Sequence, residues 1–196
     1  MWKNTEKDTE KEGKIMVLIH LATGFEEVEA LTAADLLRRA GVECRLVSVT
    51  GERVVSGTHG IRVEADCLFE EADYDNCEMI VLPGGLPGAH GLRDHAGLGK
   101  EIVRFAKEGK PLAAICAAPL VLGYHDVLQG RKATIYPGME EFLTGGMHVD
   151  KPVARDGNLI TGQGPAFAME FALELAEFLK GEETAKNIRR DLLLER

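Results

Sequence analysis

Two kinds of segment are missing from this 196-residue sequence, and each absence excludes a class of binding partner. No apolar run approaches the roughly 18 residues that span a bilayer, so we expect no membrane partner. No dense cluster of Lys and Arg offsets the net charge of −9, so we expect no nucleic-acid partner. A content of 45% hydrophobic and 28% charged residues excludes disordered, collagen-like and coiled-coil chains.

The cysteines also lack a pattern. No CxxC pair occurs, which argues against a zinc ribbon and a thioredoxin-like site. Four cysteines could form two disulfides, but the N-terminus is charged where a signal peptide would be apolar. We therefore expect a cytoplasmic protein with reduced thiols, each one either a small buried hydrophobe or a reactive group. The four are Cys44, Cys67, Cys77 and Cys116.

Short apolar runs alternate with helical periodicities along most of the chain. Residues 1–13 are polar and have no periodicity, so we predict a disordered N-terminal extension, followed by a single domain over 14–196. Strands are predicted at 15–19, 42–49, 79–82, 112–115, 132–136 and 159–161, and helices at 25–40, 98–107, 117–123, 166–179 and 182–194. This order predicts an α/β three-layer sandwich, with a mostly parallel sheet and helices on both faces.

Cys116 stands at one of the strand ends where open parallel sheets place their sites. It follows an apolar strand directly and precedes small residues, as a strained nucleophile elbow requires. A thiol at a helix N-terminus should have a lowered pKa and be more reactive. A small buried core residue would give the same pattern, and the spacing alone weighs the two interpretations about evenly.

Two further strand ends carry possible partners for this thiol. Glu29 follows Val28, whose helical period predicts that it faces the core. A carboxyl in an apolar pocket beside a thiolate would stay protonated and could donate a hydrogen bond to sulfur. Glu26 and Glu27 are interpreted as ordinary acids of a helix N-terminus. Gly84 and Gly85, after the strand predicted at 79–82, could supply exposed N–H groups to an oxyanion or form an ordinary turn.

These stretches together resemble a known family. GFEEVEA, VLPGG and AAICAAP are similar, in order and spacing, to motifs of the ThiJ/PfpI family, which includes the parkinsonism-associated protein deglycase. DLLRRAG and DGNLITGQGPAFAMEFAL extend the resemblance from about residue 14 to residue 180. It implies a flavodoxin-like fold related to class I glutamine amidotransferases, with a cysteine nucleophile elbow, and usually a homodimer.

The resemblance also implies roles by position. Cys116 matches the reactive cysteine, and Glu29 matches the protonated glutamate that hydrogen-bonds it. Gly85 and Ala117 match the residues whose N–H groups form the oxyanion pocket. Ala117 stands where protease-like branches carry a histidine, and Tyr136 stands where the deglycase-like branch often carries one. A peptidase with a Cys–His pair is therefore not expected.

The histidines show no metal-ligand spacing such as HExxH, so the sequence predicts neither a metal nor another cofactor. His59 and His148 lie in glycine-rich loops that could reach the site. With Gly84 and Tyr136, they complete the residues that we expect to line it.

Three functions remain open. The first is a cysteine-dependent enzyme of the glyoxalase or deglycase type, which would hydrate or hydrolyse a small carbonyl or a glycated adduct. The second is a redox-sensing, stress-protective, chaperone-like protein that works through oxidation of Cys116. The third is a thiamine-pathway role in thiazole monophosphate biosynthesis, for which kinase chemistry has no support because no GxxxxGK[ST] loop is present.

Overall fold

A seven-stranded sheet runs through residues 15–194, the part of the chain that this computed structural model describes. Its strand order is β10-β11-β7-β6-β1-β2-β5, and every neighbouring pair is parallel except β10 and β11. The strands of this sheet are β1 (Met16–Leu21), β2 (Glu43–Ser48), β5 (Cys67–Leu68), β6 (Cys77–Leu82), β7 (Leu112–Ile115), β10 (Val153–Asp156) and β11 (Leu159–Gly162). The predicted extension at 1–13 lies outside the described residues.

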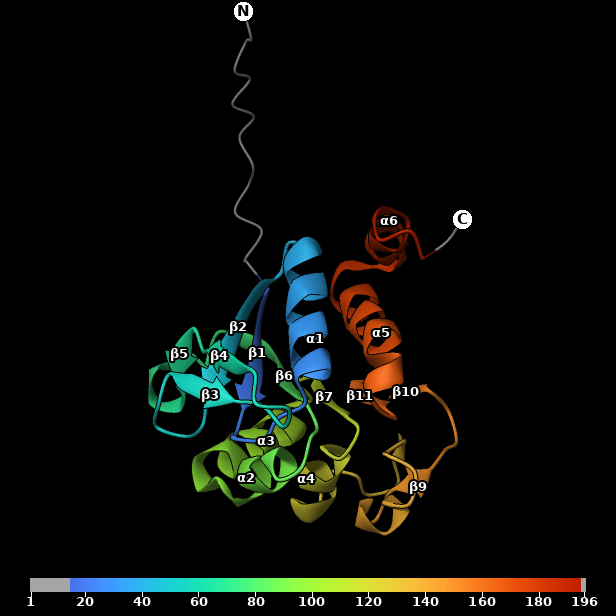
Figure 1. The fold of residues 1–196 in the computed structure, drawn as a ribbon. Helices are drawn as coiled ribbons and strands as arrows, with labels where there is room; N and C mark the ends of the chain where they lie inside the picture. The colour runs from blue at the N-terminus through green and yellow to red at the C-terminus, as the bar shows by residue number, and fades with distance from the viewer. Residues whose placement is uncertain (1–14, 195–196) are drawn as a thin grey trace, which may run out of the picture.

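Helices cover both faces of the sheet, as the alternating pattern predicted (Figure 1). Helices α1 (Glu27–Arg39), α5 (Ala168–Lys180) and α6 (Glu182–Asp191) lie on one face. Helices α2 (Gly88–Asp94), α3 (Ala96–Glu108) and α4 (Pro119–Tyr124) lie on the other. Alternate residues of β1 enter the two cores, since side chains of a strand point to opposite faces: Val17 and Ile19 into one, Met16 and Leu18 into the other. The three-layer α/β sandwich is confirmed.

Two smaller sheets stand apart from the main one. The antiparallel pair β3 (Val54–Ser56) and β4 (Arg62–Glu64) forms a hairpin. Strands β8 (Lys132–Ala133) and β9 (Met147–His148) form a parallel pair. Three single-turn 3-10 helices complete the described elements: Phe69–Glu71, Glu140–Phe142 and Pro165–Phe167.

The predicted strand at 132–136 is therefore wrong beyond Ala133. The backbone N–H of Thr134 donates to the Thr161 hydroxyl instead, and that of Tyr136 donates to the Cys116 carbonyl. These bonds replace a strand ladder and tie this segment to the ends of β11 and β7.

The orientation of α1 also differs from the prediction. Val28 is 52% exposed and Leu31 38% exposed, whereas Glu29 and the small residues Ala30 and Ala33 are buried. The small side chains let α1 lie close to the sheet and to α5, and this rotation turns Val28 outward. Glu29 is thus buried, although not for the reason that the period of Val28 suggested.

Strands β7, β6 and β1 are adjacent and parallel, so their carboxyl ends meet at one edge of the sheet. The segments that follow them are 116–119, 83–87 and 22–26. The three chemically unusual stretches of the sequence therefore come together in space.

Candidate functional site

Cys116 occupies a strained turn directly after β7. Its φ of 63° lies in the left-handed region that non-glycine residues seldom adopt. Two backbone hydrogen bonds hold this conformation: its N–H donates to the Gly162 carbonyl at 2.8 Å, and its carbonyl accepts from Tyr136 N at 2.9 Å. Only 8% of the residue is exposed. The nucleophile-elbow geometry expected at this strand end is present.

Glu29 is the acidic partner that the fold places in the same pocket. It lies in the first turn of α1 and is 1% exposed. Its Oε2 accepts a hydrogen bond of 2.8 Å from the backbone N–H of Gly84. Its Oε1 is buried and has no nitrogen or oxygen partner among the described residues, and the Cys116 thiol lies close enough to affect the pKa of this carboxyl.

Burial governs the protonation of this pair. Burial raises the pKa of Glu29 to about 7, although the Gly84 N–H and the Cys116 thiol act against that rise. Burial, followed by the charge of Glu29, raises the pKa of Cys116 to about 12. The predicted lowered thiol pKa is therefore wrong: α4 begins only at Pro119 and has six residues, too far and too short to outweigh burial. The coupled pair loses its first proton near neutral pH and keeps the second.

Two glycines make room for the sulfur and its surroundings. A Cβ on Gly84 would lie 2.6 Å from Cys116 Cβ and 2.9 Å from Glu29 Oε2, so no larger residue fits there. Gly85 has a φ of 87°, and a Cβ on it would lie 2.5 Å from the backbone nitrogen of Glu26. Close contact between the loops after β1, β6 and β7 therefore requires both glycines.

Two backbone N–H groups point their dipoles at the sulfur. The N–H groups of Gly85 and Ala117 lie close enough to Cys116 to lower the pKa of its thiol, against the larger effect of burial. Neither N–H donates to another backbone carbonyl within residues 15–194. Both donors are therefore available to an anion that forms at this position.

The other residues predicted to line the site, Tyr136, His59 and His148, lie in three different places. Tyr136 is 47% exposed, and its ring lies beside Gly164 in a groove of about 490 Å³ that Gln163 and Phe167 also line. His59 lies on the β3–β4 hairpin, which packs on the loops after β1 and β6: Thr58 N donates to the Phe25 carbonyl, and the Thr58 hydroxyl donates to the Leu86 carbonyl at 3.3 Å. His148 is exposed in β9, and in the described part of the chain no hydrogen bond or ion pair joins it to Cys116.

Sequence reasoning missed the role of Glu27. It is 3% exposed, and its Oε1 accepts the backbone N–H groups of His59 at 2.8 Å and Ile61 at 3.3 Å. Its Oε2 lies 2.9 Å from His59 Nδ1. Glu27 thus fastens the hairpin to the start of α1. The local sequence around Glu27 does not predict this contact, because its partner His59 lies 32 residues away.

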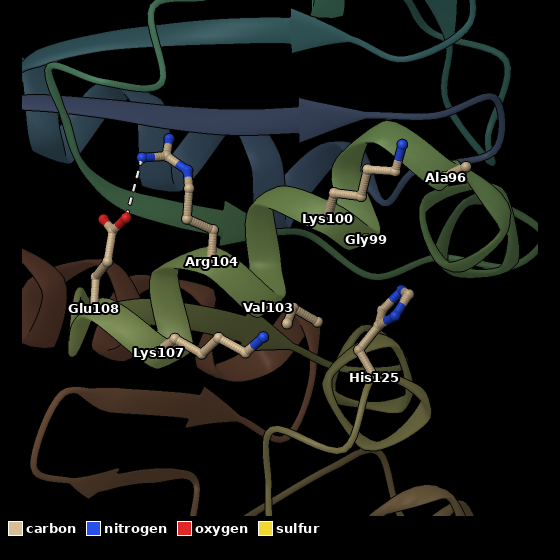
Figure 2. A pocket seen from close by; sticks show the side chains of 8 residues that line it. All are labelled: Ala96, Gly99, Lys100, Val103, Arg104, Lys107, Glu108 and His125. Atoms are coloured by element: carbon tan, nitrogen blue, oxygen red, sulfur yellow. Dashed lines mark hydrogen bonds and ion pairs between the residues drawn. The ribbon is translucent and has the colours of Figure 1, made fainter.

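A wider hollow lies away from these residues. Figure 2 shows the groove of about 570 Å³ along α3, with Lys100, Val103 and Lys107 on one side and His125 on the other. None of the predicted site residues lines it.

The other three cysteines lack these surroundings. Cys44, Cys67 and Cys77 are buried and free, and burial raises the pKa of each thiol. Among the four, Cys116 is the one with a positive φ and a buried carboxyl beside it. No helix in the described residues is both long enough and apolar enough to cross a membrane.

Comparison with known proteins agrees with this geometry. Residues 15–178 match the model of the DJ-1/PfpI family. The chain belongs to that family. It is 38% identical to Drosophila melanogaster protein dj-1beta over 179 residues. This alignment covers 90% of this chain and 96% of that protein. It is 35% identical over 170 residues to a Pyrococcus abyssi protein named as a deglycase, covering 84% of this chain and 99% of that one.

Solved structures of the family share the fold. An oxidised Toxoplasma gondii DJ-1 superposes with a TM-score of 0.88 at 39% identity, covering 91% of this chain and 98% of that chain. The structure of Drosophila melanogaster DJ-1beta superposes with a TM-score of 0.88 at 37% identity, covering 93% of this chain and 100% of that chain. The resemblance in the sequence motifs is therefore confirmed at the level of family and fold.

Proposed function

We propose that this DJ-1/PfpI protein is a cysteine-dependent enzyme that acts on reactive carbonyls. The observation that carries the proposal is the pocket in which Cys116 lies between the Glu29 carboxyl and two free backbone N–H groups. A nucleophile, a base and an oxyanion site within one small pocket are what addition to a carbonyl requires. The deglycase name of the Pyrococcus abyssi relative supports the same reaction class.

The proposed reaction on a 2-oxoaldehyde begins with addition of sulfur to the aldehyde carbon. The Glu29 carboxylate takes the thiol proton, the S–C bond forms, and the carbonyl electron pair moves onto oxygen. The N–H groups of Gly85 and Ala117 donate to that oxyanion until Glu29 returns the proton. The adduct is a hemithioacetal.

The second half converts this adduct into product. Glu29 moves the proton from the former aldehyde carbon to the neighbouring carbonyl carbon by way of an enediol, which leaves a thioester of a 2-hydroxy acid. Water then cleaves the S–C bond, frees the thiol and releases the acid. The sum is one 2-oxoaldehyde plus one water to one 2-hydroxy acid, with no redox cofactor. A glycated hemiaminal would enter by displacement: the S–C bond forms at the carbon that carries the amine, the C–N bond breaks, and the amine leaves with the proton that Glu29 took from the thiol, which gives the same hemithioacetal.

Turnover of methylglyoxal by the purified protein tests the proposal. We expect 2-hydroxy acid from the native chain and none above background from Cys116→Ser, whereas Cys67→Ser should keep the native rate. Equal rates for the native chain and Cys116→Ser would overturn it. Comparing free methylglyoxal with its preformed adduct on an amine separates the glyoxalase reaction from the deglycase reaction.

Oxidation of Cys116 is a second candidate function. The observation that favours it is the same set of donors, since two N–H groups and a protonated Glu29 could hold a sulfinate. A related Toxoplasma gondii DJ-1 is described as oxidised. Two equivalents of peroxide would convert the thiol to sulfinate, with water as the reduced product. Intact mass and peptide mapping after mild peroxide test it: modification of Cys44, Cys67 or Cys77 before Cys116 would contradict it.

We also propose that the chain is a homodimer. Val28 of α1 and Ile61 of the hairpin are exposed apolar residues on neighbouring elements, since the Glu27 side chain accepts a hydrogen bond from the backbone N–H of Ile61. Val28 is 52% exposed and Ile61 55% exposed. Adjacent exposed apolar groups of this kind favour a self-complementary interface.

A further inference from the structure

Three side chains with metal-binding atoms meet beside the loop that follows β1. Glu26 precedes α1, Glu27 begins it, and His59 comes from the β3–β4 hairpin. One ligand atom from each lies within 4.8 Å of the other two. The function proposed above uses none of these three side chains.

The spacing of these atoms suits a small divalent cation. His59 Nδ1 lies 2.9 Å from Glu27 Oε2 and 3.8 Å from Glu26 Oε2. Zinc bonds of about 2.0–2.1 Å in a tetrahedral arrangement would separate neighbouring ligand atoms by roughly 3.4 Å. The two distances lie on either side of this value, so small side-chain rotations would bring all three atoms to one ion.

Glu26 gives an independent indication of a missing ligand. It is 8% exposed, yet its carboxylate makes no hydrogen bond to any of the described residues. This carboxylate is therefore available to a cation, which can bind its oxygens directly. Its nearest partner is His59 Nδ1 at 3.8 Å, beyond hydrogen-bond distance, so its oxygen points into the cluster.

The second carboxylate is held in position by the backbone. Glu27 Oε1 is occupied by the N–H groups of His59 and Ile61, which directs Oε2 toward His59 Nδ1. Gly57 provides the space, because a Cβ there would overlap the Glu27 carboxyl. Such outer hydrogen bonds orient metal ligands in known sites.

We propose that Glu26, Glu27 and His59 form a binding site for a divalent transition-metal ion of the zinc class. One nitrogen and two carboxylate oxygens are a donor set that zinc accepts, and they balance its charge. The His59 side chain is 67% exposed, so a fourth position opens to water or a ligand. The site lies next to the reactive pocket, since Glu26 N donates to the Gly84 carbonyl at 2.9 Å. The proposal does not depend on carbonyl chemistry at Cys116.

Titration calorimetry with Zn²⁺ on the full chain, stripped of metal with a chelator, tests the site. We expect one Zn²⁺ per chain, and at least a tenfold weaker affinity in both His59→Gln and Glu26→Gln. Cys116→Ser should bind Zn²⁺ as tightly as the native chain, which separates this site from the thiol. His148→Gln is the matched histidine control and should bind normally.

Each other outcome contradicts the proposal. Absence of stoichiometric binding, unchanged binding in His59→Gln, or loss of binding in Cys116→Ser would overturn it. Equal affinity for Mg²⁺ would overturn the zinc class. Co²⁺ gives a second readout: we expect visible bands without a thiolate charge-transfer band, and that band would place the ion on sulfur. Circular dichroism of each variant shows that lost binding does not reflect unfolding.

Discussion

At the scale of single residues, the pocket depends on how Glu29 and Cys116 share protons. Both groups are buried, and burial opposes the ionised form of each. Near pH 7 the pair loses one proton, so a carboxylate and a neutral thiol, or the reverse, occupy the pocket. A base poised at neutral pH transfers protons efficiently.

The first residue-scale prediction concerns Glu29→Gln, which keeps the shape and removes the base. We expect methylglyoxal turnover to fall by about 100-fold or more, since general-base catalysis contributes that much. In the native chain the rate should rise with pH through about 7, because the raised pKa of Glu29 leaves it protonated and inactive below that value. Initial rates between pH 5 and 9 measure both effects. A variant that keeps the rise near pH 7 would exclude Glu29 as the base.

The second concerns Gly84→Ala. The new Cβ would lie 2.6 Å from Cys116 Cβ, so the turn must shift. We expect a loss of about 2 kcal/mol or more in the free energy of unfolding, as for other overpacked sites, together with loss of turnover. Gly130→Ala is the control: its φ of 68° costs about 1–2 kcal/mol, but its Cβ meets no atom within 4 Å. Urea unfolding and turnover of both variants decide the matter. Full activity of Gly84→Ala would show that the close packing does not constrain the pocket.

At the scale of elements, helix α5 packs against the end of β11, which in turn hydrogen-bonds Cys116. Phe171 is fully buried in α5, and a Cβ on Gly162 would lie 3.2 Å from its ring. Gly162 in turn accepts the N–H of Cys116. The packing of Phe171 thus reaches Cys116 through Gly162 at the end of β11.

We therefore predict that Phe171→Ala lowers the free energy of unfolding by about 3–5 kcal/mol, the usual cost of removing a buried phenylalanine. Phe178→Ala, at a partly buried position of the same helix, should cost clearly less. Urea unfolding of the two variants measures the difference. Equal costs would show that Phe171 contributes no more than a partly buried side chain of the same helix.

At the scale of the whole molecule, the exposed apolar residues of α1 and the hairpin bear on assembly. Replacing Val28 by Glu puts a charge where we propose that two copies meet, and burying an unpaired charge is unfavourable. We predict that Val28→Glu converts the dimer to a monomer in light scattering after size exclusion. Leu193→Glu, at a 78% exposed leucine far along the chain, should leave the mass unchanged. A monomeric native chain would contradict the proposal.

The sequence alone determined the alternation of the main strands and helices and the strand end at which Cys116 stands. Those features depend on the periodicity of apolar residues over short stretches, which can be read from each segment of the sequence separately. The tertiary structure decided the rest: α1 turned Val28 outward and Glu29 inward, and burial raised the pKa of Cys116 instead of lowering it. It also brought His59, which is 32 residues from Glu27 in the sequence, to both Glu26 and Glu27. Burial and long-range contacts come from packing between elements, and no local pattern of residues contains them.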